Sequence, residues 1–193
     1  TLDIPVIKAP EAFELSGALP FVVPKPPKQV KAQAPTQTNV FDHYYQFPVV
    51  ANEKKPATGG WNDPAKQSKH GFDPINFNTG IPCGKRNNLL IVDVDAKDDG
   101  VKELGKCIQE HGTPNTLCVG TPSGGFHYYF NYTSKNKQDA YIIANYIKNW
   151  TKLRGCGIDV RTQGGYVLAP PSVVSGKAYT VVNDAPPSDI PSE

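Results

Sequence analysis

The chain has 193 residues, of which 38% are hydrophobic and 20% are charged, and its formal net charge is +2. This length is sufficient for one domain with a substantial hydrophobic core, without disulfides or structural metal ions. Because no stretch approaches the roughly 18 consecutive apolar residues of a membrane span, we expect no transmembrane segment and no membrane partner. The small net charge excludes nucleic-acid binding through bulk electrostatics, so any basic surface must be local.

The first residues and the cysteines indicate a piece of a longer protein in a reducing compartment. The chain begins at Thr1 and contains no methionine, and it opens without the basic and apolar regions of a signal peptide. Its four cysteines include no Cys-x-x-Cys pair and lack the spacing of zinc ligands. We therefore expect a protein fragment that is not secreted and whose thiols are reduced, as in a cytosolic-type compartment.

Proline content divides the chain into three parts. Residues 1–36 contain seven prolines, a density that disfavours both helix and sheet. We expect these residues to form an extended arm or linker, or alternatively a tail wrapped on the domain. Residues 37–182 are expected to form the one folded domain, and residues 183–193, with three prolines, an irregular tail.

Hydrophobic patterning within the folded part predicts an α+β domain. One helix is expected to begin after Asp98 or Asp99 and to end at Gly112, and a second is expected over residues 137–153, with Trp150 on its buried face. The order of elements is β-α-β-β-α-β with an additional hairpin, so that helices cover one face of a sheet. Apolar and β-branched runs predict the short strands, at residues 88–95, 116–120, 126–132, 157–161, 166–169 and 178–182.

Two carboxylates stand at the end of the apolar run at 88–95. Asp93 and Asp95 are two residues apart on a strand, so their side chains project from the same face. Two like charges so close are expected to raise each other's pKa, and a divalent cation would remove that cost. Hard cations such as Mg²⁺ or Mn²⁺ prefer carboxylate oxygens. The pair therefore predicts a metal site, and the alternative is a strand end whose acids cap the following helix.

A third acid, Asp159, lies in the short apolar run at 157–161. An isolated carboxylate in such a strand is costly unless it is paired or bound to a metal. Arg161, two residues further on, shares its face of the strand. We expect either a plain Asp159–Arg161 ion pair or a third metal ligand beside an arginine that binds phosphate.

Residues 121–130 combine a glycine turn with an aromatic strand. Gly124 and Gly125 allow backbone N–H groups to approach a ligand closely, and Ser123 supplies a hydroxyl. His127 begins the aromatic strand, where an ionisable side chain is unusual. Together these groups predict a phosphate-binding site, and the alternative is that His127 is a hydrogen-bonded core residue.

Local basic residues are candidates for contacts with nucleic acid. The stretch at 80–86 resembles a Walker phosphate-binding loop, but it is one residue short and precedes a strand. Its Lys85 and Arg86 remain candidates for phosphate or template contacts. Residues 134–163 contain six bases against two acids, which predicts a basic surface or, alternatively, a solvated helix face. At the end of the second predicted helix the candidates are Lys148, Lys152 and Arg154.

Three motifs occur in a specific order along the chain. They are Asp-x-Asp at 93–95, Ser-Gly-Gly-x-His at 123–127, and Gly-x-Asp-x-Arg at 157–161, and the last is followed by Gly-Gly-Tyr-Val-Leu-Ala-Pro-Pro-Ser at 164–172. This order resembles the prim-pol domain of the archaeo-eukaryotic primase superfamily. The resemblance covers about residues 43 to 182, and the zinc-binding stem of some members is missing from it.

The resemblance implies a fold, an activity and a set of site residues. The implied fold is an RRM-like antiparallel or mixed sheet with helices packed on one face, and the implied activity is that of a DNA primase or polymerase with two Mg²⁺ or Mn²⁺ ions. The implied partners are single-stranded DNA template, primer, NTP or dNTP, and a fused or associated helicase, in a plasmid or viral setting. By position, the metal carboxylates are Asp93, Asp95 and Asp159, and the nucleotide-binding residues are Ser123, Gly124, Gly125, His127 and Arg161.

Two other functional classes remain open at this point. A metal-dependent nuclease would use the same carboxylates but would not need a triphosphate site. A non-catalytic nucleic-acid-binding module would not need these residues, so the presence of Asp93, Asp95, His127 and Asp159 argues against it. The sequence does not distinguish NTP from dNTP as the substrate.

Overall fold

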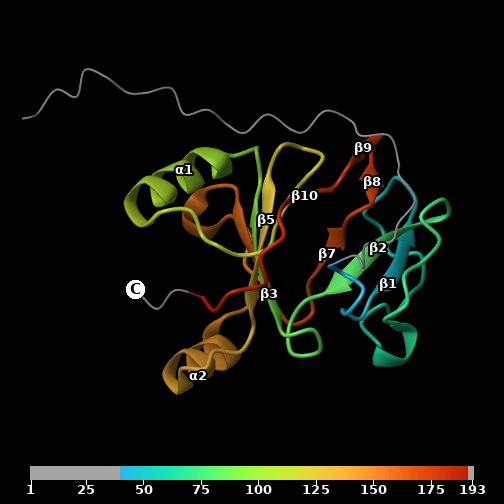
Figure 1. Cartoon of the computed structure of the whole chain (residues 1–193), viewed down its shortest axis with the longest axis horizontal. Helices are drawn as coiled ribbons and strands as arrows, with labels where there is room; N and C mark the ends of the chain where they lie inside the picture. The colour runs from blue at the N-terminus through green and yellow to red at the C-terminus, as the bar shows by residue number, and fades with distance from the viewer. Residues whose placement is uncertain (1–39, 191–193) are drawn as a thin grey trace, which may run out of the picture. The chain divides into compact units, whose positions relative to one another are not determined.

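The computed structural model describes residues 40–190, and the strands and helices are labelled in Figure 1. The predicted arm at 1–36 and residues 191–193 of the predicted tail lie outside the described residues. Neither of the two α-helices found in the described part is long and apolar enough to cross a bilayer. The helices are α1 (Gly100–His111) and α2 (Lys137–Tyr146), and the strands are β1 (Phe47–Val50), β2 (Phe77–Pro82), β3 (Leu89–Val94), β4 (Cys118–Gly120), β5 (Phe126–Asn131), β6 (Ile158–Arg161), β7 (Tyr166–Ala169), β8 (Val173–Val174), β9 (Lys177–Ala178) and β10 (Thr180–Asn183).

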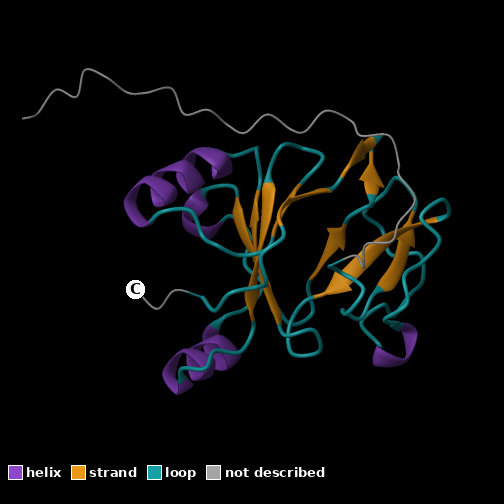
Figure 2. Cartoon of the chain, in the orientation of Figure 1, coloured by secondary structure: helices purple, strands orange, loops and turns teal. Residues whose placement is uncertain are grey.

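A five-stranded sheet forms the centre of the fold, with strand order β10-β4-β5-β3-β6. The pairs β10–β4, β4–β5, β5–β3 and β3–β6 are all antiparallel. Along the chain, β3-α1-β4-β5-α2-β6 gives the predicted β-α-β-β-α-β order, and it places β3 between β5 and β6. Both helices lie on one side of this sheet (Figure 2), so the predicted α+β class and the helix-covered face are confirmed.

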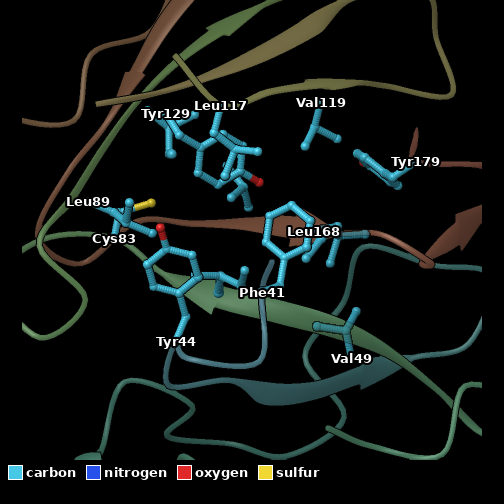
Figure 3. Packing of buried hydrophobic residues seen from close by; sticks show 14 of the residues in the cluster. Phe41, Tyr44, Val49, Cys83, Leu89, Leu117, Val119, Tyr129, Leu168 and Tyr179 are labelled. Atoms are coloured by element: carbon cyan, nitrogen blue, oxygen red, sulfur yellow. The ribbon is translucent and has the colours of Figure 1, made fainter. Parts of the chain in front are cut away.

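A second sheet lies on the other side of the five strands, and the sequence pattern did not predict it. It has the order β1-β2-β7, with antiparallel pairing throughout. Its β2 contains Gly80 and Pro82, two residue types that are depleted in strands. Buried side chains of both sheets pack together, and the cluster includes Phe41, Tyr129 and Leu168 (Figure 3).

The period-two alternation of β3 separates these two environments. Leu89 and Ile91 are buried in the cluster between the sheets, whereas Leu90 and Val94 are buried in the cluster on the helix side. Asp93 follows the odd-numbered register, so its side chain belongs to the face opposite the helices. This face is where the site described below is formed.

The second helix is shorter than the sequence pattern predicted. It ends at Tyr146, and Ile147 is already in an extended conformation. Trp150, predicted to be buried on this helix, exchanges backbone hydrogen bonds with Val160 of β6 and keeps 41% of its surface exposed. The prediction of one helix over 137–153 is therefore wrong, because backbone pairing with β6 replaces the last turns. The buried residue of α2 is Ile143.

Two glycines fix the loop that connects β3 to α1 and carries Asp95. A Cβ atom at Gly125 would overlap the Val94 carbonyl oxygen, and one at Gly100 would overlap the carbonyl oxygen of Asp95. The Asp95 N–H donates to the Gly157 carbonyl at 2.7 Å. The loop is therefore held by close backbone packing against the starts of β5, α1 and β6.

We predict that Gly125→Ala lowers the free energy of unfolding by about 1–3 kcal/mol, because the new methyl group overlaps backbone that has little freedom to move. The matched control is Gly105→Ala on α1, where a Cβ meets no atom within 4 Å. That change is expected to raise the stability by about 0.5–1 kcal/mol through helix propensity. Urea titration of both variants measures the two effects, and equal stabilities would contradict this account of the loop.

Candidate active site

A row of polar side chains crosses three neighbouring strands. In the β3–β5 pair, Asp93 is opposite His127, and in the β3–β6 pair, Asp93 is opposite Asp159. Directly opposed residues of antiparallel strands have Cβ atoms about 4.5–5.5 Å apart and share one face. The sheet therefore brings together three residues that the sequence predicted as one site, although they are separated by more than thirty positions along the chain.

The Arg161 guanidinium connects the two carboxylates of this row. One of its nitrogens lies 2.6 Å from Asp159 Oδ2 and 3.4 Å from Asp93 Oδ2. On the other side, His127 Nε2 lies 3.4 Å from Asp93 Oδ1. The Lys152 backbone N–H donates to Asp159 Oδ1 at 2.7 Å. The Asp159–Arg161 ion pair expected as one alternative is therefore present, and it extends to Asp93.

Burial and charge act in opposite directions on the Asp93 carboxyl group, which keeps 18% of its side-chain surface exposed. Burial opposes ionisation, but the hydrogen bond and charge of His127, together with Arg161, outweigh it and hold the pKa of Asp93 below its ordinary value. The expectation that the neighbouring acid would raise this pKa is therefore wrong for Asp93. The groups nearest to it belong to the adjacent strands, and Arg161 among them is a cation.

Asp95 occupies a different environment from the row. It follows the last residue of β3 and is exposed. Its charge, with that of Asp93, contributes after burial to the raised pKa of Tyr179. The following helix has Asp99 at its N-cap position without a side-chain cap hydrogen bond, so the helix-capping alternative for the Asp-x-Asp pair finds no support there.

The donor set suits a hard cation, although the carboxylates are not gathered into a ready cluster. Within residues 40–190, no three acidic, imidazole or thiol groups come together closely enough to hold a metal ion. Asp93 and Asp159 offer two opposed carboxylates, and Asp95 offers a third at the end of the strand. These oxygen donors are of the kind that Mg²⁺ and Mn²⁺ prefer.

The glycine turn at 121–125 uses its backbone amides internally. The Gly124 N–H donates to the Thr121 carbonyl at 3.0 Å, and the Gly125 N–H donates to the Thr121 hydroxyl at 3.1 Å. Ser123 is exposed, with its hydroxyl 3.0 Å from that of Thr121. The turn therefore presents the Ser123 hydroxyl to solvent, whereas both glycine amides already have partners.

His127 differs from an ordinary satisfied core histidine. It is 5% exposed, and its Nδ1 atom is buried without a hydrogen-bond partner among the described residues. Its ring lies 5.7 Å from the Tyr179 ring, centroid to centroid. A buried polar atom without a partner is costly and is often found where a ligand or water completes the bonding.

Asp93, His127 and Arg161 line a cleft of about 410 Å³ between the two sheets. Three of the residues along it were not singled out by the sequence pattern, namely Lys54, Asn149 and Tyr179. Asn149 accepts a hydrogen bond from the Thr162 N–H at 2.7 Å and donates to the Gln163 carbonyl at 2.9 Å. None of the three had a local signal, because each lies in a connecting segment outside the strands that only the tertiary fold brings to the cleft.

The predicted nucleic-acid contacts fall into different environments. Lys85 and Lys148 are exposed and line one groove of about 520 Å³. Arg86 lies over the Tyr45 ring, 3.7 Å from its centroid, and Lys152 forms a salt bridge with Asp98 at 3.0 Å. Because α2 ends at Tyr146 with Ile147 as its C-cap, Lys148 directly follows the helix end, whereas Lys152 lies well beyond it, unlike the predicted grouping. The side chain of Arg154 lies outside the described residues.

Comparison with known families places this geometry in context. The model of the Prim-Pol family, described as the N-terminal domain of bifunctional DNA primase/polymerase, matches residues 37–193. No curated protein matches the chain. The family match covers the two sheets, both helices and the whole polar row on β3, β5 and β6. The chain therefore belongs to the Prim-Pol family of DNA primase/polymerase domains.

Proposed function

We propose that this domain adds nucleotides to a primer, or starts a primer, on a single-stranded DNA template. The observation that carries the proposal is the row of Asp93, His127 and Asp159 with Arg161 in a chain of the Prim-Pol family, in which Asp93, His127 and Arg161 line one cleft. The strand order β4-β5-β3-β6 with both helices on one face supports an RRM-like catalytic core.

Mg²⁺ or Mn²⁺ would be held by Asp93, Asp159 and Asp95. A pair of such ions supplies charge stabilisation for the attacking and leaving oxygens of an in-line phosphoryl displacement. The lowered pKa of Asp93 keeps its carboxylate ionised, which is the state that ligates a cation. The exposure of Asp95 leaves its oxygens accessible from solvent.

The incoming nucleotide, NTP or dNTP, would be bound through its phosphates beside this row. Arg161 keeps 30% of its side-chain surface exposed and carries further N–H donors in a fork that suits phosphate. His127 Nε2 faces Asp93, so the imidazole would hydrogen-bond the nucleotide through Nδ1, the ring nitrogen without a partner among the described residues. The Ser123 hydroxyl is a third donor at the turn that precedes β5. Positioning and charge neutralisation by these groups suffice, and no covalent intermediate is required.

The decisive experiment is incorporation of labelled nucleotides on a primed and an unprimed single-stranded template. Asp93→Asn and Asp159→Asn should each abolish incorporation, because each removes a charged oxygen ligand while keeping the side-chain volume. The matched control is Asp184→Asn, at an exposed residue outside the cleft, which should retain wild-type activity. Full activity of either row variant, with circular dichroism unchanged, would refute the assignment. Template cleavage in Mn²⁺ without nucleotides would instead favour a nuclease.

The lowered pKa of Asp93 predicts a pH dependence of stability. The folded protein holds this carboxyl ionised down to lower pH than the unfolded chain does, so ionised Asp93 stabilises the fold above its ordinary pKa of 3.8. This contribution is lost as the pH falls through the lowered folded value. Unfolding free energies of wild type and Asp93→Asn, measured with a chelator, should differ most near neutral pH and converge below about pH 3.8. A constant difference would contradict the cause given for the shift.

The groove lysines are proposed to contact the DNA backbone. Lys85→Ala and Lys148→Ala should each reduce the slope of log Kd against log salt by about one unit for single-stranded DNA. Lys152→Ala should have a smaller effect, because its ammonium is paired with Asp98. The matched control is Lys177→Ala, an exposed lysine on β9 that does not line the groove. Anisotropy titrations measure the slopes, and equal slopes for all four variants would refute the groove as a DNA path.

A further inference from the structure

Helix α2 carries two exposed tyrosines on the surface of the domain. Tyr141 is 56% exposed and Tyr146 is 61% exposed. Their rings contact each other in an edge-to-face arrangement, with centroids 6.1 Å apart. The buried residue of α2 is Ile143, so the packing of this helix does not explain the exposure of the two tyrosines. Neighbouring exposed aromatic rings are a surface that a flat partner can cover.

The tyrosine pair lies one helical turn from the basic groove. Ala144 and Asn145 line that groove, and they follow Tyr141 by three and four residues, so they share its side of the helix. The Asn145 side chain donates to the Tyr141 carbonyl at 2.8 Å, which fixes this turn. Lys148 and Lys85 line the same groove.

The groove continues toward the cleft that contains Asp93. Asn149 lines both hollows, so the two meet at this side chain. The groove and the cleft together form a continuous path, with a cation on each side of Asn149. Arg161 lies on the cleft side and Lys148 on the groove side. A partner that follows this path would be an extended, negatively charged chain.

Charge on α2 and beyond it also favours an anionic partner. Lys137 precedes Tyr141 by four residues and is exposed, as are Lys135 and Lys148. The segment 134–163 carries six bases against two acids. Aromatic rings interleaved with cations form the surface on which unpaired bases stack while their phosphates are neutralised.

We propose that Tyr141 and Tyr146 form a stacking platform for the bases of an unpaired DNA strand, which then follows the groove of Lys85 and Lys148 to the cleft. The proposal rests on the proposed function, since it takes the cleft as the destination of the strand. On this surface the lysines contact only the phosphates of the strand, and the two tyrosines add contacts to its bases. The platform is sequence-tolerant, because every base offers a flat face.

The test compares two oligonucleotides of equal length and charge, an oligothymidylate and a strand of abasic sites. The double variant Tyr141→Ala/Tyr146→Ala should raise Kd for oligothymidylate roughly tenfold or more and leave the salt slope unchanged. Its Kd for the abasic strand should stay at the wild-type value. Tyr141→Phe/Tyr146→Phe should restore binding, because phenylalanine retains the ring. The matched control is Ile142→Ala, which removes an exposed apolar side chain of the same helix and should change Kd little.

Each contrary outcome overturns the platform. Equal loss for both oligonucleotides would mean that the tyrosines act through charge or structure, and failure of the phenylalanine variant would exclude stacking. Tyrosine-dependent binding of polyglutamate, with oligothymidylate binding unaffected, would assign the surface to an acidic protein. The proposed function is tested separately, by incorporation on saturating primed template. An inactive wild type would refute the proposed function, whereas the binding comparison would still decide whether the tyrosines stack bases.

Discussion

The Arg161 guanidinium between Asp93 and Asp159 is the interaction on which the rest of the site depends. Two carboxylates opposed across neighbouring strands would repel each other in a partly buried row, and this repulsion would destabilise the pairing of β3 with β6. Arg161 lies two residues after Asp159, so the strand that contributes one acid also contributes the cation that balances both. On the other neighbouring strand, His127 Nε2 lies 3.4 Å from Asp93 Oδ1. The row can therefore be built into the sheet before any ligand binds.

Much of this row was predictable from strand periodicity, but its electrostatics were not. The period of two placed Asp93 on one face of its strand, and the same rule placed Asp159 with Arg161. The sequence pattern compared Asp93 with Asp95, whose Cα atoms are about 6.6 Å apart along a strand. The residues directly across the sheet are closer, with Cβ atoms about 4.5–5.5 Å apart. The sign of the Asp93 pKa shift is accordingly decided by His127 and Arg161, whose proximity to Asp93 no local pattern identifies.

The remaining errors have a common origin in tertiary pairing. The apolar spacing from Ile142 to Leu153 suits a helix, yet residues after Tyr146 pair with the edge of β6. The small sheet was missed because Gly80 and Pro82 weaken the local strand signal of β2, whereas pairing with β1 and β7 stabilises it. Gly125 was predicted to help bind phosphate. The structure gives a more direct reason for a glycine there, because a Cβ atom would overlap the backbone of β3. Intrinsic propensity describes the conformation that a segment prefers in isolation. In each of these cases, contacts with neighbouring strands determine the conformation instead.

The short connection between the two sheets has a mechanical consequence. Only residues 162–165 separate β6, which carries Arg161, from β7, which forms part of the opposite wall of the cleft. Asn149 ties this connection down through hydrogen bonds to two of its backbone groups. These four residues therefore close one end of the cleft, and their hydrogen bonds with Asn149 restrict their movement. Separating the walls at that end would pull directly on the strand bearing Asp159 and Arg161, so widening of the cleft must be concentrated at the end away from this joint.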